Sequence, residues 1–383
     1  MLYPSRPSWL ASLALSLLVA CGGGGGSSGS MASPNVPLSS DPMDAYPPTP
    51  AGTAPGASAA AKAAAAALAS GINFGNMLEA PTEGEWGLKA DDEFINLVGA
   101  TGGTGGISKA VRLPVRWSAH ASKDAAATID PVFLTRVESV VNKLLARGAT
   151  VVLNMHHYAQ LDGDAPPASE GMVAGELVKP RFLAMWKQIA TRFANADKQH
   201  LIFELYNEPH GTLEAGWNEL FSRVLRVIRE TNPDRIVVVG PVGWNNASQL
   251  PKLVLPADAH LVLTVHHYEP FTFTHQGADW ISPILPIGLD CCDATQLAAI
   301  RGPMDTAVAE AKRLGYPIFI GEFGAYSKAA MAARVRYVKA FRSLAAERGL
   351  SWMYWELASG FGVYDPVAHA FRPDIYNALF GSP

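Results

Sequence analysis

The sequence contains little cysteine and little net charge. Only 3 of its 383 residues are cysteine, and they do not form the spaced Cys/His quartet of a structural zinc site. The formal net charge of -4 gives no basic surface to displace the counterions of a nucleic acid, so we expect no nucleic-acid partner. With 49% apolar and 17% charged residues, the composition is that of a globular protein, long enough for one large α/β domain or two smaller ones.

The N-terminus is predicted to be an export signal. Arg6 supplies a positive charge, and residues 9–20 form an apolar stretch of roughly 12 residues, too short to span a bilayer but typical of a signal peptide. The stretch ends in LVAC at Cys21, which resembles the bacterial lipobox, in which the cysteine is lipidated. We expect residues 1–21 to be a signal peptide with a lipobox, and Cys21 to anchor an exported bacterial protein at the outer membrane or cell surface. The alternative is ordinary cleavage near Ala20, followed by secretion.

Residues 22–58 are predicted to be a linker. They are rich in glycine, serine, proline and alanine and have almost no large apolar residues, so they cannot bury enough surface to fold. Residues 59–383 are then the single folded domain. An alanine-rich helix over residues 59–69 is expected to lead into it.

Cys291 and Cys292, the two cysteines of this domain, are adjacent. In an oxidising compartment they can form a vicinal disulfide, although adjacent cysteines rarely pair without strain. Two loop thiols or an intermolecular bridge are the alternatives.

Eight apolar runs of strand length recur along the domain. They span residues 71–76, 110–117, 150–158, 201–208, 236–241, 261–268, 318–324 and 351–357. Most are continuously apolar, as expected of parallel strands covered on both faces. Helix starts at Pro131 and Pro180 and helix ends at Gly148, Gly315 and Gly349 lie between them. These strand-then-helix units predict an α/β fold of the (β/α)8 (TIM) barrel type. A doubly wound open sheet is the alternative, but no GxGxxG follows the first run.

Polar side chains gather at or near one end of these runs. They are Arg112, His156, His157, Asn207, Glu208, His266, His267, Tyr268, Glu322, Trp355 and Glu356. The loops after all strands of a barrel open onto the same face, and that face carries the active site of barrel enzymes. We therefore expect an active site there.

Glu208 ends the run LIFELYNE, and Glu322 follows the run IFIG. Two carboxyl groups that face each other across a cleft can cleave an acetal: one protonates the leaving oxygen while the other attacks the anomeric carbon or activates water. Asn207 is a natural donor to a substrate hydroxyl, and Arg112 and Tyr268 are placed to keep Glu322 ionised by charge and hydrogen bonding. Taken singly, each glutamate also has a structural interpretation; together they predict a catalytic pair.

The histidine pairs raise the alternative of a metal site. Adjacent residues of a strand point to opposite faces, so neither His156 with His157 nor His266 with His267 chelates from one side. The sequence has no HxH or HExxH motif. We expect no catalytic metal and no other cofactor.

Several aromatic residues lie on the expected rim loops, where their rings can stack on the apolar faces of sugar units. They are Trp86, Trp117, Trp244, Phe271, Trp280, Trp355 and Phe361. Most tryptophans of any protein are core residues, so this set has meaning only beside the two carboxylates. Trp355, at the end of the eighth run, is the best candidate for a sugar platform.

Together these segments resemble the endoglucanases (cellulases) of glycoside hydrolase family 5. The resemblance runs from residue 71 to about residue 380 and rests on GINFGNMLEAPTEGEWG, VRLPVRW, LNMHHY, ELYNEPHG, VHHYEPFTFTHQGADW, IGEFGAY and YWELASGFGVYD. It implies that Glu208, in the NEP motif, is the acid/base and that Glu322 is the nucleophile. It implies active-site support by Arg112, His156, Asn207, His266, Tyr268 and Trp355. It implies substrate contacts by Asn76, Glu79, His157, Trp280 and Trp355.

The function that this resemblance implies is a retaining endo-β-1,4-glucanase that hydrolyses cellulose-type β-glucans by double displacement. We expect a monomer that meets a membrane only through a lipid on Cys21. A β-mannanase, or a xyloglucan or mixed-linkage glucanase, is the alternative on the same scaffold, because the shared residues act on the scissile bond while the loops select the sugar. A non-catalytic carbohydrate-binding lipoprotein would be signalled by loss of either glutamate, and both are present. A metal-dependent hydrolase would be inhibited by chelators.

Overall fold

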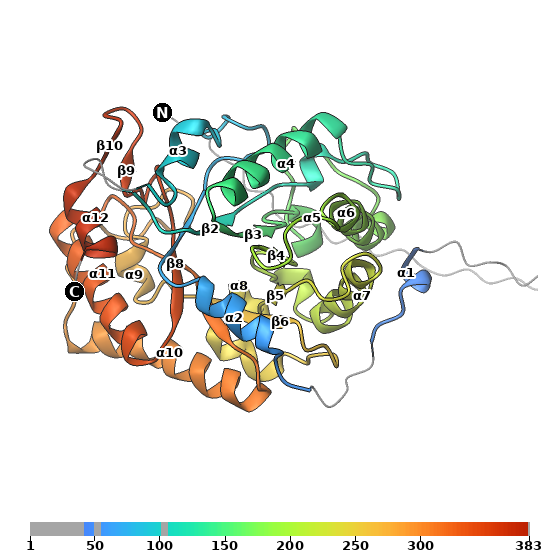
Figure 1. Cartoon of the computed structure of the whole chain (residues 1–383). Coiled ribbons are helices and arrows are strands. Elements are labelled where there is room, and N and C mark those ends of the chain that lie inside the picture. The colour runs from blue at the N-terminus through green and yellow to red at the C-terminus, as the bar shows by residue number, and fades with distance from the viewer. Residues whose placement is uncertain (1–41, 50–54, 101–105, 382–383) are drawn as a thin grey trace, which may run out of the picture. The chain divides into compact units, whose positions relative to one another are not determined.

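The eight predicted strands form one closed parallel barrel (Figure 1). The computed structural model of the protein describes residues 42–49, 55–100 and 106–381. The strands pair in chain order, and β8 returns to pair with β1. They are β1 (Gly71–Asn73), β2 (Ala110–Leu113), β3 (Thr150–Asn154), β4 (Leu201–Glu204), β5 (Val237–Val239), β6 (Leu261–His266), β7 (Ile318–Phe323) and β8 (Ser351–Tyr354). The prediction of a (β/α)8 barrel is confirmed.

Helices surround the barrel, as they do in the predicted fold. They include α3 (Asp92–Leu97), α4 (Pro131–Ala146), α6 (Val178–Arg192), α7 (Trp217–Arg229), α10 (Ala294–Leu314), α11 (Met331–Glu347) and α12 (Pro373–Phe380). Their ends follow the local sequence: Asp130 caps α4 by accepting from the amide of Val132 at 2.8 Å, and Gly315 ends α10 with a φ of 80°. Helix α6 begins at Val178 rather than Pro180. A proline is tolerated in the first turn because the backbone amides of that turn have no acceptor within the helix.

The fifth strand-helix unit departs from the expected regularity. Between β5 and β6 the structure has only the four-residue α8 (Val242–Asn245) and a 3-10 turn (Ala247–Lys252). Gly243 and Pro251 interrupt this segment, so no long helix forms there. The other α-helices are α1 (Pro42–Ala45), α2 (Ala59–Ala67), α5 (Ala159–Asp162) and α9 (Phe271–Thr274), and β9 (Tyr364–Asp365) and β10 (Ala370–Phe371) form a small hairpin.

Most strands are shorter than the apolar runs that predicted them. β3 ends at Asn154 and β4 at Glu204, so the polar tails of both runs are loops. His156 and His157 therefore follow β3 instead of alternating along it. Their ring centroids are 4.6 Å apart, and the argument that they point to opposite faces of a strand does not apply.

The barrel has an apolar floor and a polar upper layer. Side chains two apart on a strand point to the same side, so Arg112 lies above Ala110 on β2 and Glu204 lies above Ile202 on β4. The floor is one buried cluster of Ala110, Val152, Ile202, Ile236, Val238, Val262, Phe319 and Met353 with Ala61, Ala64, Ala65 and Leu68 from the α2 region. The alanine-rich α2 thus closes one end of the barrel and keeps water from the layer that holds the charges.

Residues 42–49 of the predicted linker contact helices of the barrel. Residues 1–41, which include the predicted signal peptide, Cys21 and most of the linker, lie outside the described residues. Just after them, the carbonyl oxygens of Met43 and Tyr46 accept from the Arg223 guanidinium of α7 at 2.6 and 2.9 Å. The Lys187 ammonium of α6 also donates to the Tyr46 hydroxyl at 2.7 Å. A few polar contacts thus fix residues that composition alone assigned to a tether.

Two further features complete the fold. Cys291 and Cys292 form a disulfide, the first of the alternatives left open by the sequence. Across residues 42–49, 55–100 and 106–381, no helix has the length and apolar character needed to cross a bilayer.

Candidate active site

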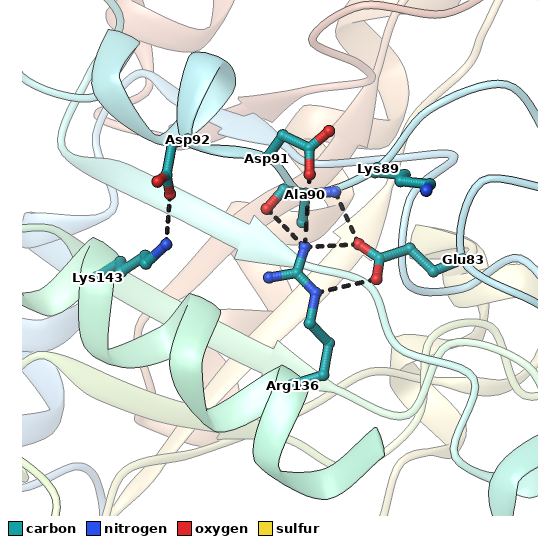
Figure 2. A pocket seen from close by; sticks show the side chains of 7 residues that line it. All are labelled: Glu83, Lys89, Ala90, Asp91, Asp92, Arg136 and Lys143. Atoms are coloured by element: carbon teal, nitrogen blue, oxygen red, sulfur yellow. Dashed lines mark hydrogen bonds and ion pairs between the residues drawn. The ribbon is translucent and has the colours of Figure 1, made fainter. Parts of the chain in front are cut away.

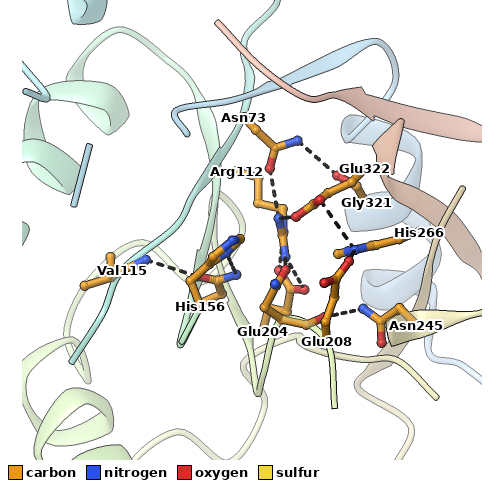
Figure 3. A network of polar contacts seen from close by, with 12 residues as sticks. Asn73, Arg112, Val115, His156, Glu204, Glu208, Asn245, His266, Gly321 and Glu322 are labelled. Carbon is orange, nitrogen blue, oxygen red and sulfur yellow. Dashed lines mark hydrogen bonds and ion pairs between the residues drawn. The ribbon is translucent and has the colours of Figure 1, made fainter. Parts of the chain in front are cut away.

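Glu208 and Glu322 lie at the same end of the barrel and face each other (Figure 3). Glu208 is on the loop after β4 and Glu322 is near the end of β7. One carboxylate oxygen of each lies within 4.8 Å of the other and of a ring nitrogen of His266. Carboxyl groups are roughly 5–5.5 Å apart in retaining glycosidases and roughly 6.5–9.5 Å apart in inverting ones, and oxygens this close together favour the retaining arrangement.

Arg112 is the centre of the polar network below the two glutamates. It is fully buried and forms a bidentate pair with Glu204, from Nε to Oε2 at 2.6 Å and from Nη2 to Oε1 at 2.9 Å. Its Nη1 donates to Glu322 Oε1 at 2.5 Å and to Asn73 Oδ1 at 2.9 Å. Its Nη2 also donates to Asn207 Oδ1 at 2.6 Å. One guanidinium therefore fixes residues from β1, β4, the loop after β4, and β7.

The two glutamates have different surroundings. Glu322 also accepts from the Tyr268 hydroxyl at 2.8 Å, so both of its carboxylate oxygens have donors. Glu208 has a single side-chain partner, His266 Nδ1 at 2.7 Å, and 26% of its side chain is exposed. Hydrogen-bond donors stabilise the charged form of a carboxylate. Glu322 is therefore better suited to remain ionised, and Glu208 is better suited to hold a proton and donate it as the acid.

The pKa values agree with this assignment. Burial raises the pKa of Glu208 to about 7, against the opposing charge of Arg112. Burial also raises the pKa of Glu322, but His266, Arg112 and the Tyr268 hydroxyl oppose that rise. Burial lowers the pKa of His266 to about 4, so this ring is neutral at ordinary pH. Of the two carboxyl groups, Glu208 is therefore the one suited to hold a proton and Glu322 the one whose charge the surroundings support.

His156, His157 and Trp355 form one wall of the site. The His156 ring stacks on Trp355 with centroids 5.3 Å apart and planes 11° apart, and its Nδ1 lies 3.2 Å from Asn154 Nδ2. Burial lowers the pKa of both histidines well below the usual range. They are therefore neutral hydrogen-bonding groups. His157 is half-buried and meets the edge of Trp86 at 6.1 Å.

Glu79 departs from its expected role as a substrate contact. It is fully buried, and its carboxylate accepts from the backbone amides of Asn76 and Met77. Burial raises its pKa to about 8. With no exposed surface and both oxygens bonded to the main chain, it supports the loop after β1. Asn76 is half-buried on that loop and donates to Ser359 Oγ at 2.9 Å across to the loop after β8.

The aromatic residues divide between the rim and the core. Trp117 and Phe361, which we expected on the rim, are buried, at 0% and 4% exposure. Trp244 and Trp280 are 55% and 54% exposed, and Phe271 is 38% exposed. Trp280 meets the edge of the Tyr326 ring at 4.7 Å. Exposed rings at the cleft are free to stack on a sugar, whereas buried ones are not.

Sequence reasoning missed Glu204, Asn73, Asn154 and Asn245, which hold the site from behind. Asn73 Nδ2 donates to the carbonyls of Gly321 and Tyr354 at 3.1 and 3.2 Å, while its oxygen accepts from Arg112. A signal for Glu204 was present: a carboxylate in the middle of an apolar run needs a buried cation as its partner. The asparagines gave no such signal, because many of their partners are backbone groups: carbonyls for Asn73 and Asn245, and the Val115 amide for Asn154.

Glu208, His266 and Glu322 are also the residue types that bind metals, and their ligand atoms are close enough together to surround an ion. However, the Arg112 guanidinium already contacts Glu322, and a cation placed beside it would be repelled. His266 and Tyr268 already contact one oxygen of Glu208 and one of Glu322. The chemistry of this set is that of an acid pair with orienting donors.

A separate hollow of about 360 Å³ lies beside the loop after β1 (Figure 2). Its charged side chains pair with one another: Arg136 contacts Glu83 at 2.8 and 2.9 Å, and Lys143 contacts Asp92 at 2.5 Å. Arg136 also donates to the carbonyl of Ala90 at 2.9 Å. This hollow contains neither catalytic carboxylate. Its ion pairs fasten the loop that carries Trp86.

Comparison with known families gives the same assignment. The family model described as cellulase (glycosyl hydrolase family 5) matches residues 74–360. This range includes the site residues from Asn76 to Glu356. The chain belongs to this family. The matched range of this family 5 chain contains both Glu208 and Glu322.

Two related family members come from Acetivibrio thermocellus. Endoglucanase H is 33% identical over 323 residues, a match that covers 82% of this chain and 33% of that protein. The cellulase/esterase CelE is 29% identical and is matched over 77% of this chain and 36% of its own length. This family 5 chain thus spans about a third of the length of these two relatives.

Solved structures have the same fold. An endoglucanase that is 37% identical superposes with a TM-score of 0.78, covering 85% of this chain and 100% of that one. Cel5A of Thermotoga maritima, solved with cellobiose, is 38% identical with a TM-score of 0.75 over 83% of this chain and 99% of its own. Cel5A was also solved with mannotriose, at 37% identity and a TM-score of 0.74 over 83% and 99% of the chains.

The Arg112–Glu204 pair predicts a large stability effect. Glu204→Ala leaves part of a buried guanidinium without its partner and should lower the free energy of unfolding by about 3–5 kcal/mol. The matched control is Glu138→Ala, which removes an exposed ion pair with Arg192 and should change it by no more than about 1 kcal/mol. Urea denaturation measures both. Equal changes in the two variants would contradict the central role of the buried pair.

Proposed function

We propose that the protein is a retaining endo-β-1,4-glucanase that hydrolyses internal bonds of cellulose-type β-glucans. The observation that carries this proposal is the pair Glu208 and Glu322, whose carboxylate oxygens lie within 4.8 Å and whose surroundings differ as an acid and a nucleophile require. The names of the related endoglucanases support the choice of substrate. We also propose that it acts as a monomer.

The geometry supports a double displacement. Glu322, ionised by Arg112 and Tyr268, attacks the anomeric carbon while Glu208 donates its proton to the leaving oxygen. This forms a covalent glycosyl-enzyme and releases the leaving chain. Glu208, now ionised, takes a proton from a water molecule, and that water displaces Glu322. Each displacement inverts the anomeric carbon, so the product retains the β configuration.

A β-mannanase is the second candidate on the same scaffold. It is favoured by the mannotriose complex of Thermotoga maritima Cel5A, which is 37% identical to this chain. The residues at the scissile bond serve either sugar, so the difference lies in the loops of the rim.

The first test is the stereochemistry of the product. Proton NMR of the first products from a soluble β-1,4-glucan should show the β anomer, because the carboxylates are too close to admit a water beneath the sugar ring. Reducing-sugar release from cellulose, mixed-linkage glucan, xyloglucan and mannan should be highest on the cellulose-type substrates. Initial α anomers would mean an inverting enzyme, and no release from any substrate would refute a glycosidase.

Variants of the two glutamates should fail differently. Glu322→Gln should lower turnover about 10⁴- to 10⁶-fold on all substrates while oligosaccharides still bind, because the amide forms no glycosyl-enzyme. Glu208→Ala should lose about 10²- to 10⁴-fold on polysaccharide but much less on aryl glycosides, whose leaving groups need little protonation. Glu138→Gln is the surface control and should retain full activity. If Glu208→Ala lost activity equally on polysaccharide and on aryl glycosides, Glu208 would be excluded as the acid.

We further propose that the enzyme is exported and anchored through a lipid on Cys21, with ordinary secretion as the alternative. The LVAC sequence after a short apolar stretch supports this. Cys21→Ser should move the protein out of the membrane fraction or leave an uncleaved precursor, with unchanged activity of the folded domain. Ser27→Ala, a nearby control, should stay in the membrane fraction. A wild-type protein found only as a soluble product without lipid would refute the anchor.

A further inference from the structure

His210 lies two residues after Glu208, and both of its ring nitrogens face acceptors. Nδ1 is 2.6 Å from the carbonyl oxygen of Glu208 and 3.5 Å from Asp162 Oδ1. Nε2 is 3.3 Å from Asp164 Oδ2. A neutral imidazole has one donor and one acceptor nitrogen, so it would leave one of these contacts without a proton. Only the imidazolium donates on both sides.

The surroundings of the ring favour the same charged form. The indole of Trp244 stacks on His210 with centroids 4.6 Å apart and planes 19° apart, the arrangement in which an aromatic face attracts a cation. Burial lowers the pKa of His210, but Asp162, the Glu208 carbonyl and Asp164 outweigh it, and the pKa is raised above its usual value. Burial raises the pKa of Asp162 to about 7. When Asp162 takes up a proton, the exposed Asp164 still faces the ring.

Trp244 cannot easily leave this position. Gly243, Trp244 and Asn245 all have left-handed backbone conformations, with φ of 68°, 59° and 56°. Such a turn is strained at the two residues with side chains and persists only when its surroundings hold it. The Trp244 amide donates to the Pro209 carbonyl at 3.3 Å, and Asn245 Nδ2 donates to the Asn207 carbonyl. The turn is thus bonded to the segment that carries Glu208.

We propose that His210 is a positioning residue for the acid: held as an imidazolium by Asp162 and Asp164, it fixes the Glu208 main chain and places a positive charge beside the Glu208 carboxyl. The inference rests on the proposed role of Glu208 as the acid. Burial alone makes a carboxyl hold its proton too tightly to give it away, and a nearby cation offsets this. His210 therefore keeps Glu208 a strong enough acid to protonate the leaving oxygen.

Other charges also act on these two groups. Those that act on Glu208 are Arg112, Glu204, His266, Glu322 and Tyr268. Those around His210 are Asp162, Asp164, Tyr206 and His157. Tyr206 donates to Asp162 and leaves the other oxygen of that carboxylate toward His210. Arg112 contacts Glu322 directly, whereas His210 contacts the main chain of Glu208, so of the two catalytic glutamates the charge of His210 acts mainly on Glu208.

The test is the pH dependence of kcat/KM on cellotetraose. The alkaline limb reports loss of the proton from the acid, so removing a nearby positive charge should move this limb to higher pH, by about half a unit to one unit. His210→Asn keeps a donor for the Glu208 carbonyl but has no charge, and it should show this shift. His200→Asn is the matched control, because His200 forms an exposed pair with Asp197, and its limb should not move. If His210→Asn lowers kcat but leaves the pH of the alkaline limb unchanged, His210 has only a structural role and the proposal is overturned.

A second measurement does not depend on the variants. NMR of the wild-type enzyme with labelled histidine should show His210 doubly protonated at pH 7, and Asp162→Asn should lower the pH at which it titrates. A His210 ring that is neutral at pH 6 would overturn the inference even if the enzyme hydrolyses glucans. If the wild-type enzyme hydrolysed no glucan, the proposed function would be refuted, but the titration of His210 measured by NMR would not change. The two failures are therefore distinguishable.

Discussion

The buried Arg112 guanidinium is the charge on which the catalytic end of the barrel depends. It lies in the layer above an apolar floor, where water does not screen it, and it therefore needs carboxylates as partners. Glu204 supplies a fixed bidentate pair, and Glu322 supplies the second. Because Arg112 comes from β2 and its partners from β4 and β7, the same contacts tie opposite sides of the barrel together. The stability of the fold and the geometry of the site are thus set by one group.

This arrangement also explains how two glutamates in one cleft acquire opposite tasks. Arg112 touches Glu322 directly but reaches the Glu208 segment only through the Asn207 side chain. The charge therefore stabilises one carboxylate far more than the other. His266, which is neutral and close to both, adds hydrogen bonding without removing the asymmetry. Two carboxylates that share a site separate their pKa values in this way.

Much of this could be predicted from the sequence. Continuous apolar runs and their punctuation predicted eight parallel strands, and the polar residues after them predicted the catalytic face. What the sequence did not reveal depends on distant partners: Glu79 became a buried support because two backbone amides reach it, and Trp117 became a core residue. The contacts of residues 42–49 escaped notice for the same reason, since Arg223 holds them through main-chain carbonyls. Composition says which side chains are apolar, but it does not say which backbone groups a folded chain will bring to a polar side chain.

The way in which Glu79 and Glu356 hold their loops has an evolutionary consequence. Both carboxylates accept from main-chain amides, those of Asn76 and Met77 in one loop and those of Ala358, Ser359 and Phe361 in the other. Every amino acid except proline has such an amide, so the anchorage does not specify the side chains that it holds. The tips of these loops are therefore free to accumulate substitutions while their bases stay in register with the barrel. A scaffold built in this way can exchange the sugar that it recognises without rebuilding the machinery that breaks the bond.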